Sequence, residues 1–144
     1  MIRRLESDDI DVIAKIWLDT NIQAHSFISK EYWETNLDLV RKNLLEAEIY
    51  IYENGINIIQ GFIGITGNYI AGIFVIQEMQ SKGIGKKLID FVKNIRNKLS
   101  LNVYIKNERA VSFYLREGFT IKKEVCDINT GEKEYHMIWH KANL

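Results

Sequence analysis

Proline is absent from the 144 residues of this chain, although an average usage of about 5% would supply about seven. The turns and strand ends must therefore be made by other residues, and Asn-Gly, Gly-Asn and Asn-Thr-Gly stand where turns are expected. The absence excludes a collagen-like chain, which is rich in proline and periodic glycine. It does not by itself select a fold class.

Other features are also scarce. Cys126 is the single cysteine, which excludes an intramolecular disulfide and a cysteine-rich metal site. Neither sign of charge is in excess, since 19 basic residues balance 19 acidic ones, and this argues against general binding of nucleic acid or anionic membranes. No apolar run approaches the ~20 residues of a membrane span, and no apolar segment follows the charged start. We therefore expect a cytoplasmic protein without nucleic-acid or membrane partners.

The remaining composition is that of an ordinary globular protein. Hydrophobic residues make up 47% of the chain and charged residues 26%, which excludes intrinsic disorder. A chain of this length buries roughly 68–70% of the surface that its unfolded form exposes, enough for a core without disulfides or metals. We expect residues 1–144 to form a single domain.

Hydrophobic periodicity predicts the order of helices and strands. A helix should begin after Ser7 or Asp8, where acidic residues suit the positive helix end, and should run to about Ile22. The other helices are expected at 30–46, 83–97 and 108–117, and the strands at 2–5, 49–53, 56–66, 69–76, 99–105, 119–125 and 134–140. The order β-α-α-β-β-β-α-β-α-β-β predicts a mixed α/β layer fold, a largely antiparallel sheet with flanking helices.

Local signals add detail to this outline. Asn54-Gly55 predicts a two-residue hairpin turn, because both residues tolerate positive φ. Gly61 and Gly64 predict bulges or close approaches in the return strand, and Ser29 should cap the helix 30–46. The residues expected on the buried side of that helix are Trp33, Leu37, Val40, Leu44 and Leu45, and those of the helix 83–97 are Ile84, Leu88, Ile89, Val92 and Ile95.

The stretch Gln-Ser-Lys-Gly-Ile-Gly-Lys-Lys at 80–87 joins an expected strand to an expected helix. Its glycines let the backbone approach a ligand, and the free N–H groups of the first helical turn favour a phosphate or pyrophosphate. A plain helix start with surface lysines explains this segment alone equally well. A P-loop would need glycine at Gln80 and Ser or Thr at Lys87, and a dinucleotide fingerprint would need glycine at Leu88.

Gln-x-x-Gly-x-Gly opening a helix after a strand resembles the acyl-CoA loop of the GCN5-related N-acetyltransferases (GNATs). The segment 107–119 resembles that family's second motif, N-x-x-A-x-x-F-Y-x-x-x-G-F. The likeness is specific over about residues 70–125, and the element order extends it to the whole chain. A shorter likeness at 16–18 and 24–28 is shared with a bacterial subgroup typified by YjaB-like acetyltransferases.

The resemblance implies acetyl-CoA as the acyl donor, without a metal. In this family the strand before the loop splays from its neighbour and pairs with pantetheine, which assigns the backbone of Phe74, Val75 and Ile76 to the cofactor. The amide of Asn107 would bind pantetheine, cap the following helix, or do both. The loop residues that would hold the pyrophosphate are Lys82, Gly83, Ile84, Gly85 and Lys86.

The resemblance also implies direct attack of a primary amine on the thioester. Tyr114 is expected to act as the general acid, because a phenol with a pKa near 10 can donate to a thiolate whose conjugate acid has a pKa near 8.5. A packed core tyrosine is the alternative. The strand 69–76 holds no acid, so the general base stays open, with a water relay that includes His25 as one candidate. The residues expected to border the acceptor are His25, Phe27, Tyr32 and Tyr69, each of which has packing as an alternative role.

The sequence therefore predicts an acetyl-CoA-dependent N-acetyltransferase that acts on an amine-bearing small molecule or a protein amine. The rival interpretation is a non-catalytic acyl-CoA-binding or regulatory module that kept the loop and lost turnover. Relatives often dimerise through sheet edges or helix faces, which leaves a homodimer open.

Overall fold

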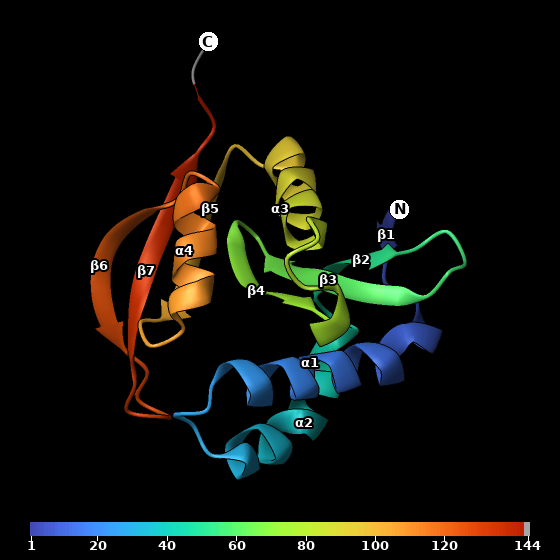
Figure 1. The fold of residues 1–144 in the computed structure, drawn as a ribbon, viewed down its shortest axis with the longest axis horizontal. Coiled ribbons are helices and arrows are strands. Elements are labelled where there is room, and N and C mark those ends of the chain that lie inside the picture. The colour runs from blue at the N-terminus through green and yellow to red at the C-terminus, as the bar shows by residue number, and fades with distance from the viewer. Residues whose placement is uncertain (143–144) are drawn as a thin grey trace.

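The computed structural model describes residues 1–142, and within them seven strands form one sheet flanked by four helices (Figure 1). The sheet order is β1-β2-β3-β4-β5-β7-β6. The strands are β1 (Ile2–Arg4), β2 (Glu48–Glu53), β3 (Ile59–Thr66), β4 (Tyr69–Val75), β5 (Lys98–Tyr104), β6 (Thr120–Cys126) and β7 (Lys133–His140). The helices are α1 (Ile10–Ala24), α2 (Lys30–Leu44), α3 (Ile84–Ile95) and α4 (Glu108–Arg116), with short 3-10 turns at Ser7–Asp9 and Gln77–Met79. The mixed α/β fold and the element order predicted from the sequence are confirmed.

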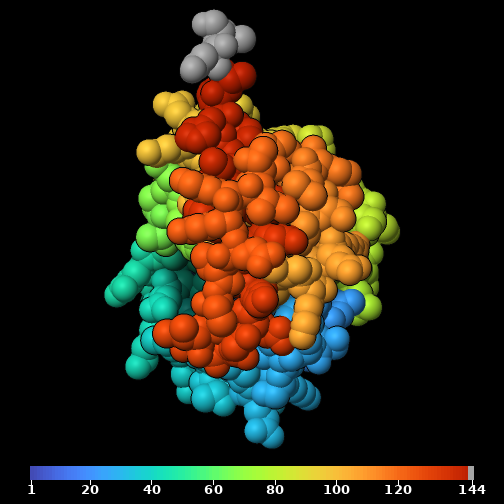
Figure 2. Space-filling view, turned by 90° about the vertical axis from the view of Figure 1, so that its left-hand side faces the viewer, coloured from blue at the N-terminus to red at the C-terminus, as the bar shows by residue number. Residues whose placement is uncertain are grey.

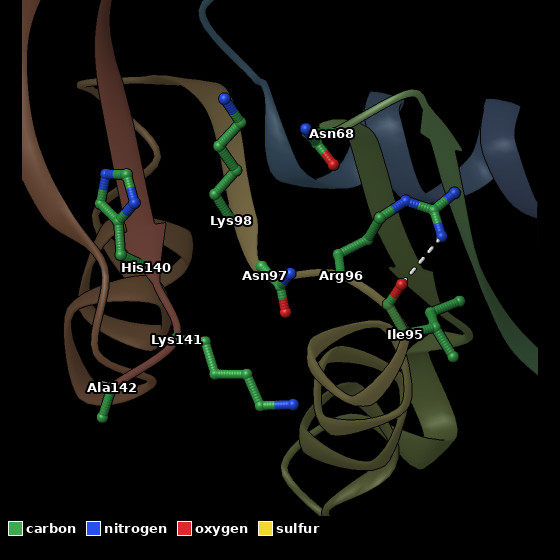
Figure 3. A pocket seen from close by; sticks show the side chains of 8 residues that line it. All are labelled: Asn68, Ile95, Arg96, Asn97, Lys98, His140, Lys141 and Ala142. Atoms are coloured by element: carbon green, nitrogen blue, oxygen red, sulfur yellow. Dashed lines mark hydrogen bonds between the residues drawn. The ribbon is translucent and has the colours of Figure 1, made fainter. Parts of the chain in front are cut away.

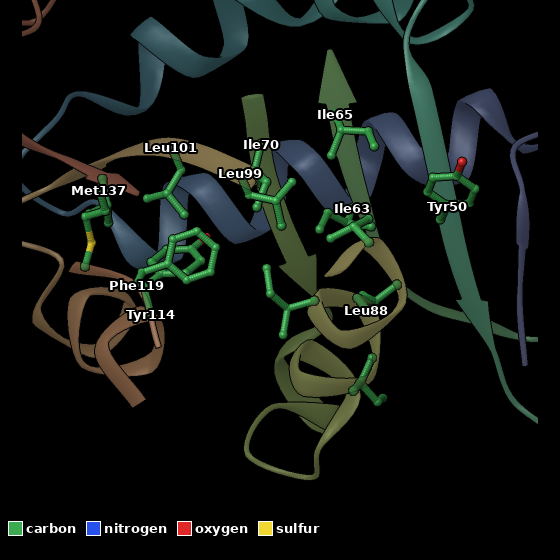
Figure 4. Packing of buried hydrophobic residues seen from close by; sticks show 14 residues of the cluster. Tyr50, Ile63, Ile65, Ile70, Leu88, Leu99, Leu101, Tyr114, Phe119 and Met137 are labelled. Carbon is green, nitrogen blue, oxygen red and sulfur yellow. The ribbon is translucent and has the colours of Figure 1, made fainter. Parts of the chain in front are cut away.

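The two faces of the sheet are buried under different helices. Side chains alternate between the faces of a strand, and in β2 this sends Ile49 and Ile51 into a core shared with α1 and α2, while Tyr50 enters the core shared with α3. The α3–α4 core extends across the sheet to Phe119 and Met137, with Tyr114 of α4 at its edge (Figure 4). Each helix pair therefore covers one face of the sheet.

The strands β4 and β5 are paired over a short distance. They run parallel and pair at Tyr69 with Ser100 and at Ile70 with Leu101, and at no further residue of the described chain. By contrast, β5 pairs with β7 along all seven of its residues. From residue 72 onward β4 therefore keeps β3 as a partner and has lost β5. The predicted splay is present.

Gly61 is required by the close approach of β3 to β4. A Cβ atom built on Gly61 would lie 2.7 Å from the carbonyl oxygen of Phe74, which is too close for any side chain. Gly64 precedes an irregularity in the same pairing, between Gly64 and Ile65. Both glycines thus occupy the kind of site that was predicted for them.

The turn between β2 and β3 differs from the two-residue hairpin predicted at Asn54-Gly55, and that prediction is wrong. The strand β3 begins at Ile59, and the residue with positive φ in the turn is Asn57. The Asn54 side chain organises this longer loop, because its Oδ1 accepts the backbone N–H groups of Ile56 and Ile58 at 3.0 Å each. Side-chain bonds of this kind compete with the tight turn that the dipeptide alone would favour.

Two residues predicted to be buried are exposed. Leu45 is 63% exposed because α2 ends at Leu44, and Ile95 is 40% exposed because it is the last residue of α3. The Ser29 cap is confirmed, since its hydroxyl accepts the N–H of Tyr32 at 3.3 Å. Within residues 1–142 no helix is both long enough and apolar enough to cross a membrane.

Substitution of Gly61 by alanine tests the close approach of β3 and β4. The new methyl group must push Phe74 and the free side of β4 outward, so we expect Gly61→Ala to lower the free energy of unfolding by about 1–3 kcal/mol. Gly55→Ala is the matched control, because a Cβ there meets nothing within 4 Å. Urea unfolding of both variants measures the difference, and equal stabilities would contradict the assigned contact.

Candidate functional site

Beyond Ile70 the backbone of β4 has a free side. Alternate residues of a strand turn their N–H and C=O groups toward the same neighbour, and the N–H of Ile76 donates to Gln60 on the β3 side at 3.0 Å. Ile73 and Val75 therefore turn their backbone groups away from β3. In agreement, the Val75 carbonyl accepts a bond from Nε2 of the Gln80 side chain at 3.0 Å. The free groups can pair with an extended ligand as an added strand would.

The three strand residues predicted to contact the cofactor differ in the direction of their backbone groups. Val75 lies on the free side, whereas the backbone of Phe74 pairs with Phe62 of β3 and the Ile76 N–H is already bonded. The Phe74 ring stacks on Phe62 in the α1–α2 core. Ile73, which was not singled out in the sequence, shares the free side with Val75. Which residues of β4 turn their backbone groups toward the free side depends on how β4 pairs with β3.

The start of α3 has the free backbone donors that the predicted anion site would need. Gly83 caps the helix with φ at +90°, a conformation in which a residue with a Cβ is strained. The N–H of Lys87 is the first that bonds within the helix, to Gly83 at 3.0 Å. The N–H groups of Ile84, Gly85 and Lys86 therefore have no helical partner and can receive a phosphate oxygen.

A cavity of about 660 Å³ brings these two features together. Its lining includes Ile73 and Val75 of β4, the end of α1 at Gln23 and Ala24, and loop residues up to Lys86. Gly85 permits close packing there, because a Cβ on it would lie 3.4 Å from the Phe113 ring. The lining residues from α4 and its ends are Asn107, Arg109, Ala110, Phe113, Tyr114, Arg116 and Glu117.

The charges around the cavity are distributed differently from the lysine cluster expected in the loop. The Lys86 ammonium lies 3.2 Å from Glu117 and 3.4 Å from Asp90, and hydrogen bonding to Glu117 raises its pKa. Lys82 is exposed and outside the lining. The cavity instead receives Arg109, which donates to Gln80 at 2.7 Å and to Ser81 at 2.6 Å and so ties the loop to α4. Sequence spacing alone did not indicate this role of Arg109.

Tyr114 reaches the cavity from the α3–α4 core. The residue is 8% exposed, and its ring meets Phe113 and Phe119 edge to face. Burial raises the pKa of the phenol, with a further contribution from Tyr69. Its hydroxyl makes no hydrogen bond to another described residue, although the side chain borders the cavity. A protonated phenol with a free hydroxyl is thus held at the cavity wall.

Asn107 connects the cavity to the α1–α2 connection. Its Oδ1 accepts the N–H of Ala110 at 3.3 Å, which confirms the helix cap. Its amide Nδ2 lies 3.1 Å from Nε2 of His25. With the amide as donor, the His25 Nε2 is the acceptor, and the imidazole proton resides on Nδ1.

His25 is part of an aromatic cluster. Its ring stacks on Trp33 at 5.3 Å and meets Phe27 at 5.6 Å and Tyr104 at 5.1 Å, measured between ring centroids. Burial lowers the pKa of the imidazole to about 4, and its Nδ1 is buried without a partner. The ring is therefore neutral near pH 7, and its accepting nitrogen is already occupied by Asn107. This arrangement is suited to positioning Asn107 more than to taking a proton.

The other residues predicted to border the acceptor lie on the α1–α2 side of the sheet. Phe27 meets the Tyr104 ring at 5.7 Å, and Tyr32 meets Trp33 at 4.9 Å. Tyr69 is the first residue of β4 and one of the two at which β4 pairs with β5. Figures 1 and 2 both place the turn between β6 and β7 beside the α1–α2 connection. Phe27, Tyr32 and Tyr69 thus lie outside the cavity lining, and the first two belong to the aromatic cluster around His25 and Trp33.

A second hollow, of about 770 Å³, lies at the far end of the sheet where β5 begins and β7 ends (Figure 3). Its lining is basic, with Arg96, Lys98 and Lys141, but Arg96 is bonded to Glu48 at 2.6 Å and to Gly67 at 3.1 Å. None of the motif residues reaches it. Among residues 1–142 no three His, Cys, Asp or Glu side chains gather as metal ligands.

The buried His25 predicts a specific dependence of stability on pH. In the unfolded chain the imidazole has a pKa near 6.5, whereas in the folded chain burial lowers its pKa to about 4. The stabilisation from a neutral His25 is therefore complete above pH 6.5 and is lost as the pH falls toward 4. The free energy involved is about 2–3 kcal/mol. Urea unfolding from pH 4 to 7 should show a shallower dependence for His25→Gln than for the wild type. Parallel curves would contradict a neutral His25.

Known proteins resemble this chain in sequence. Residues 46–121 match the family described as the acetyltransferase (GNAT) domain. The peptidyl-lysine N-acetyltransferase YiaC of Escherichia coli is 34% identical over 123 residues, 84% of each chain. YjaB, a peptidyl-lysine N-acetyltransferase of the same bacterium, is 30% identical over 129 residues, 88% of each chain.

Solved structures agree in fold. The solution structure of apo-form YjaB has a TM-score of 0.86 at 27% identity, over 99% of this chain and 98% of that one. PaiA N-acetyltransferase of Thermoplasma acidophilum, in complex with coenzyme A, has a TM-score of 0.81 at 19% identity, over 97% and 98% of the two chains. With its two motifs, its parted strands and these relatives, the chain belongs to the GNAT family, in its YjaB-like subgroup, and is an acetyl-CoA-dependent N-acetyltransferase.

Proposed function

We propose that this enzyme acetylates the side-chain amine of lysine in peptides or proteins, and that residues 1–144 form one catalytic domain. The observation that carries the proposal is the early end of β4–β5 pairing, beside the free N–H groups of α3 and the hydroxyl of Tyr114. Two relatives that cover most of the chain are named peptidyl-lysine N-acetyltransferases, which favours lysine over other primary amines.

The residues of the cavity fit acetyl-CoA. Ile73 and Val75 would pair with the pantetheine amides, and the N–H groups at 84–86 would receive the pyrophosphate. Arg109 and Arg116, which also line the cavity, add positive charge for the phosphates. When bound, acetyl-CoA supplies an acetyl group activated as a thioester.

Binding would require a local exchange of hydrogen bonds. The Gln80 side chain holds the Val75 carbonyl, and Arg109 holds Gln80. The pantetheine arm can replace Gln80 at Val75, and a phosphate can compete for Arg109. Asn107, positioned by His25, contributes an amide at the same wall of the cavity.

The backbone of β4 and the Tyr114 side chain would assist different steps of the acetyl transfer. The Val75 N–H, on the free side of β4, is the proposed donor to the oxygen that becomes negative as the amine attacks. Tyr114 is the proposed general acid for the departing sulfur, because burial keeps its phenol protonated and its hydroxyl has no competing partner. The attack is direct, without an acyl-enzyme intermediate.

The rival function is a regulatory module that binds acyl-CoA without turnover. A screen with acetyl-CoA and blocked peptides containing one lysine, read by thiol release and by acetylated mass, separates the two. Acetylated peptide is expected. Tight binding of acetyl-CoA by calorimetry without any acetylated product, from lysine peptides or from a panel of small amines, would favour the module instead.

The variant Tyr114→Phe tests the general acid. We expect kcat to fall about 100-fold or more, within the usual range for loss of a positioned acid, while the Kd for acetyl-CoA changes little. Tyr50→Phe is the control, since Tyr50 is a buried tyrosine of the same core but bonds to Glu48 away from the cavity. Steady-state kinetics and calorimetry provide both quantities, and full turnover by Tyr114→Phe would remove it from the mechanism.

A further inference from the structure

Glu134 of β7 lies beside the end of β5 that has parted from β4, on the α1–α2 face. In β7 it pairs with Tyr104 of β5, and four residues earlier in β5 Ser100 pairs with Tyr69 of β4. Directly paired residues share a face, as do residues two or four apart in one strand. Tyr69, Tyr104 and Glu134 therefore project to the same side. The intervening residues Leu101 and Val103 point into the α3–α4 core.

The Glu134 carboxylate is half-buried and has no ion pair or hydrogen bond within residues 1–142. Other shielded carboxylates in the described chain have a basic partner. Glu53 and Asp9 bond to Arg3, and Glu48 bonds to Arg96. Neither carboxylate oxygen of Glu134 is fully buried, so this unpaired charge is accessible to a cationic partner from outside the chain.

The groups that face Glu134 from neighbouring elements also favour a cation there. Burial and the nearby Asp127 raise its pKa, and Asp127 accepts the Tyr104 hydroxyl at 2.6 Å. Burial and the charges of Asp127 and Glu134 raise the pKa of Tyr32 on α2.

The neighbouring basic groups are already engaged. Lys106 bonds to Glu132 at 3.1 Å while lying over the Phe27 ring, and His136 bonds to Asn102 at 2.7 Å. His25 is neutral near pH 7 and bonds to Asn107. Within the described chain, two carboxylates thus face aromatic rings at the sheet opening without a cation between them.

Tyr69 connects this group to the general acid. Its pKa is raised by burial and by the charge of Glu134, and Tyr69 in turn contributes to the raised pKa of Tyr114. Tyr114 is more than nine-tenths buried, with a free hydroxyl at the cavity on the other face. Tyr69, one of the two residues at which β4 pairs with β5, is thus a neighbour of both Glu134 and Tyr114.

We propose that Glu134 binds the lysine ammonium of the acceptor and takes its proton before attack, so that it is the general base missing from β4. This inference rests on the proposed function. One N–H bond of the ammonium breaks and one O–H bond forms at the Glu134 carboxyl group. After the C–N bond has formed and the C–S bond has broken, the nitrogen loses its second surplus proton to solvent. Tyr114 protonates the sulfur and regains a proton from solvent, and Glu134 returns its proton to solvent, so a net one proton is released per turnover.

The experiment compares the wild type with Glu134→Gln, using a blocked peptide with one internal lysine. At pH 7 we expect kcat/KM for the peptide to fall about 100-fold, with the KM for acetyl-CoA unchanged. The difference in kcat/KM between Glu134→Gln and the wild type should shrink as the pH approaches ~10.4, the ordinary pKa of lysine, because the amine then loses its proton unaided. Calorimetry with CoA present should show peptide binding weakened about tenfold, as expected for loss of a charge-assisted bond.

Two further variants serve as controls for the Glu134→Gln measurements. Glu124→Gln removes an exposed carboxylate from the neighbouring strand β6 and should behave as the wild type. Glu134→Asp keeps the carboxylate and should retain the wild-type shape of the pH profile with lower activity.

The outcomes separate this inference from the proposed function. A Glu134→Gln enzyme with wild-type kcat/KM, pH profile and peptide affinity overturns the role of Glu134 while the acetyltransferase function stands. If the wild type does not acetylate the peptide, the proposed acceptor fails. A calorimetric loss confined to Glu134→Gln would still support Glu134 as the ammonium site.

Discussion

The structure depends on the short pairing of β4 with β5, which ends after two residues. Because β3 continues to hold β4, the strand stays extended and turns the N–H and C=O groups of Ile73 and Val75 away from β3, where the Val75 carbonyl accepts only the Gln80 side chain. A strand edge of this kind inside a sheet is a ready partner for an extended chain. In the proposed reaction, the same parting would serve both the cofactor and the acceptor.

The faces of the sheet have different chemistry, and this difference suits a two-substrate reaction. On the α3–α4 side the helix N-terminus and Arg109 favour phosphate. On the α1–α2 side, Asp127 and Glu134 stand among aromatic rings and favour an amine. The net charge of zero, counted over the whole chain, gives no sign of these local differences. A balanced composition excluded a general nucleic-acid binder but concealed this separation of charge.

Much of the fold could be predicted because it depends on local signals. The glycine at Gly83 and the Asn107 cap mark helix starts through interactions among neighbouring residues, and hydrophobic spacing predicts the order of elements. The hairpin turn was predicted wrongly because a side chain forms hydrogen bonds with residues beyond the two turn positions. At Asn54 the carboxamide bonded to residues two and four positions ahead and lengthened the turn.

The site was predicted less completely because its details depend on pairing between distant strands. The phase of β4 against β3 decides that Ile73 and Val75, and not Phe74 and Ile76, have free backbone groups. Glu134 comes within reach of Tyr69 only through the intervening strand β5. Likewise, the bond between His25 and Asn107 spans 82 residues of sequence. Spacing along the chain carries no information about such contacts.

Amide hydrogen exchange followed by NMR tests the central claim most directly, because it reads the free backbone groups themselves. On addition of CoA, we expect slower exchange at the Ile73 and Val75 amides and at Ile84, Gly85 and Lys86. Unchanged exchange at these five amides would contradict it, above all if CoA instead protected amides around Lys98 and Lys141 at the far end of the sheet.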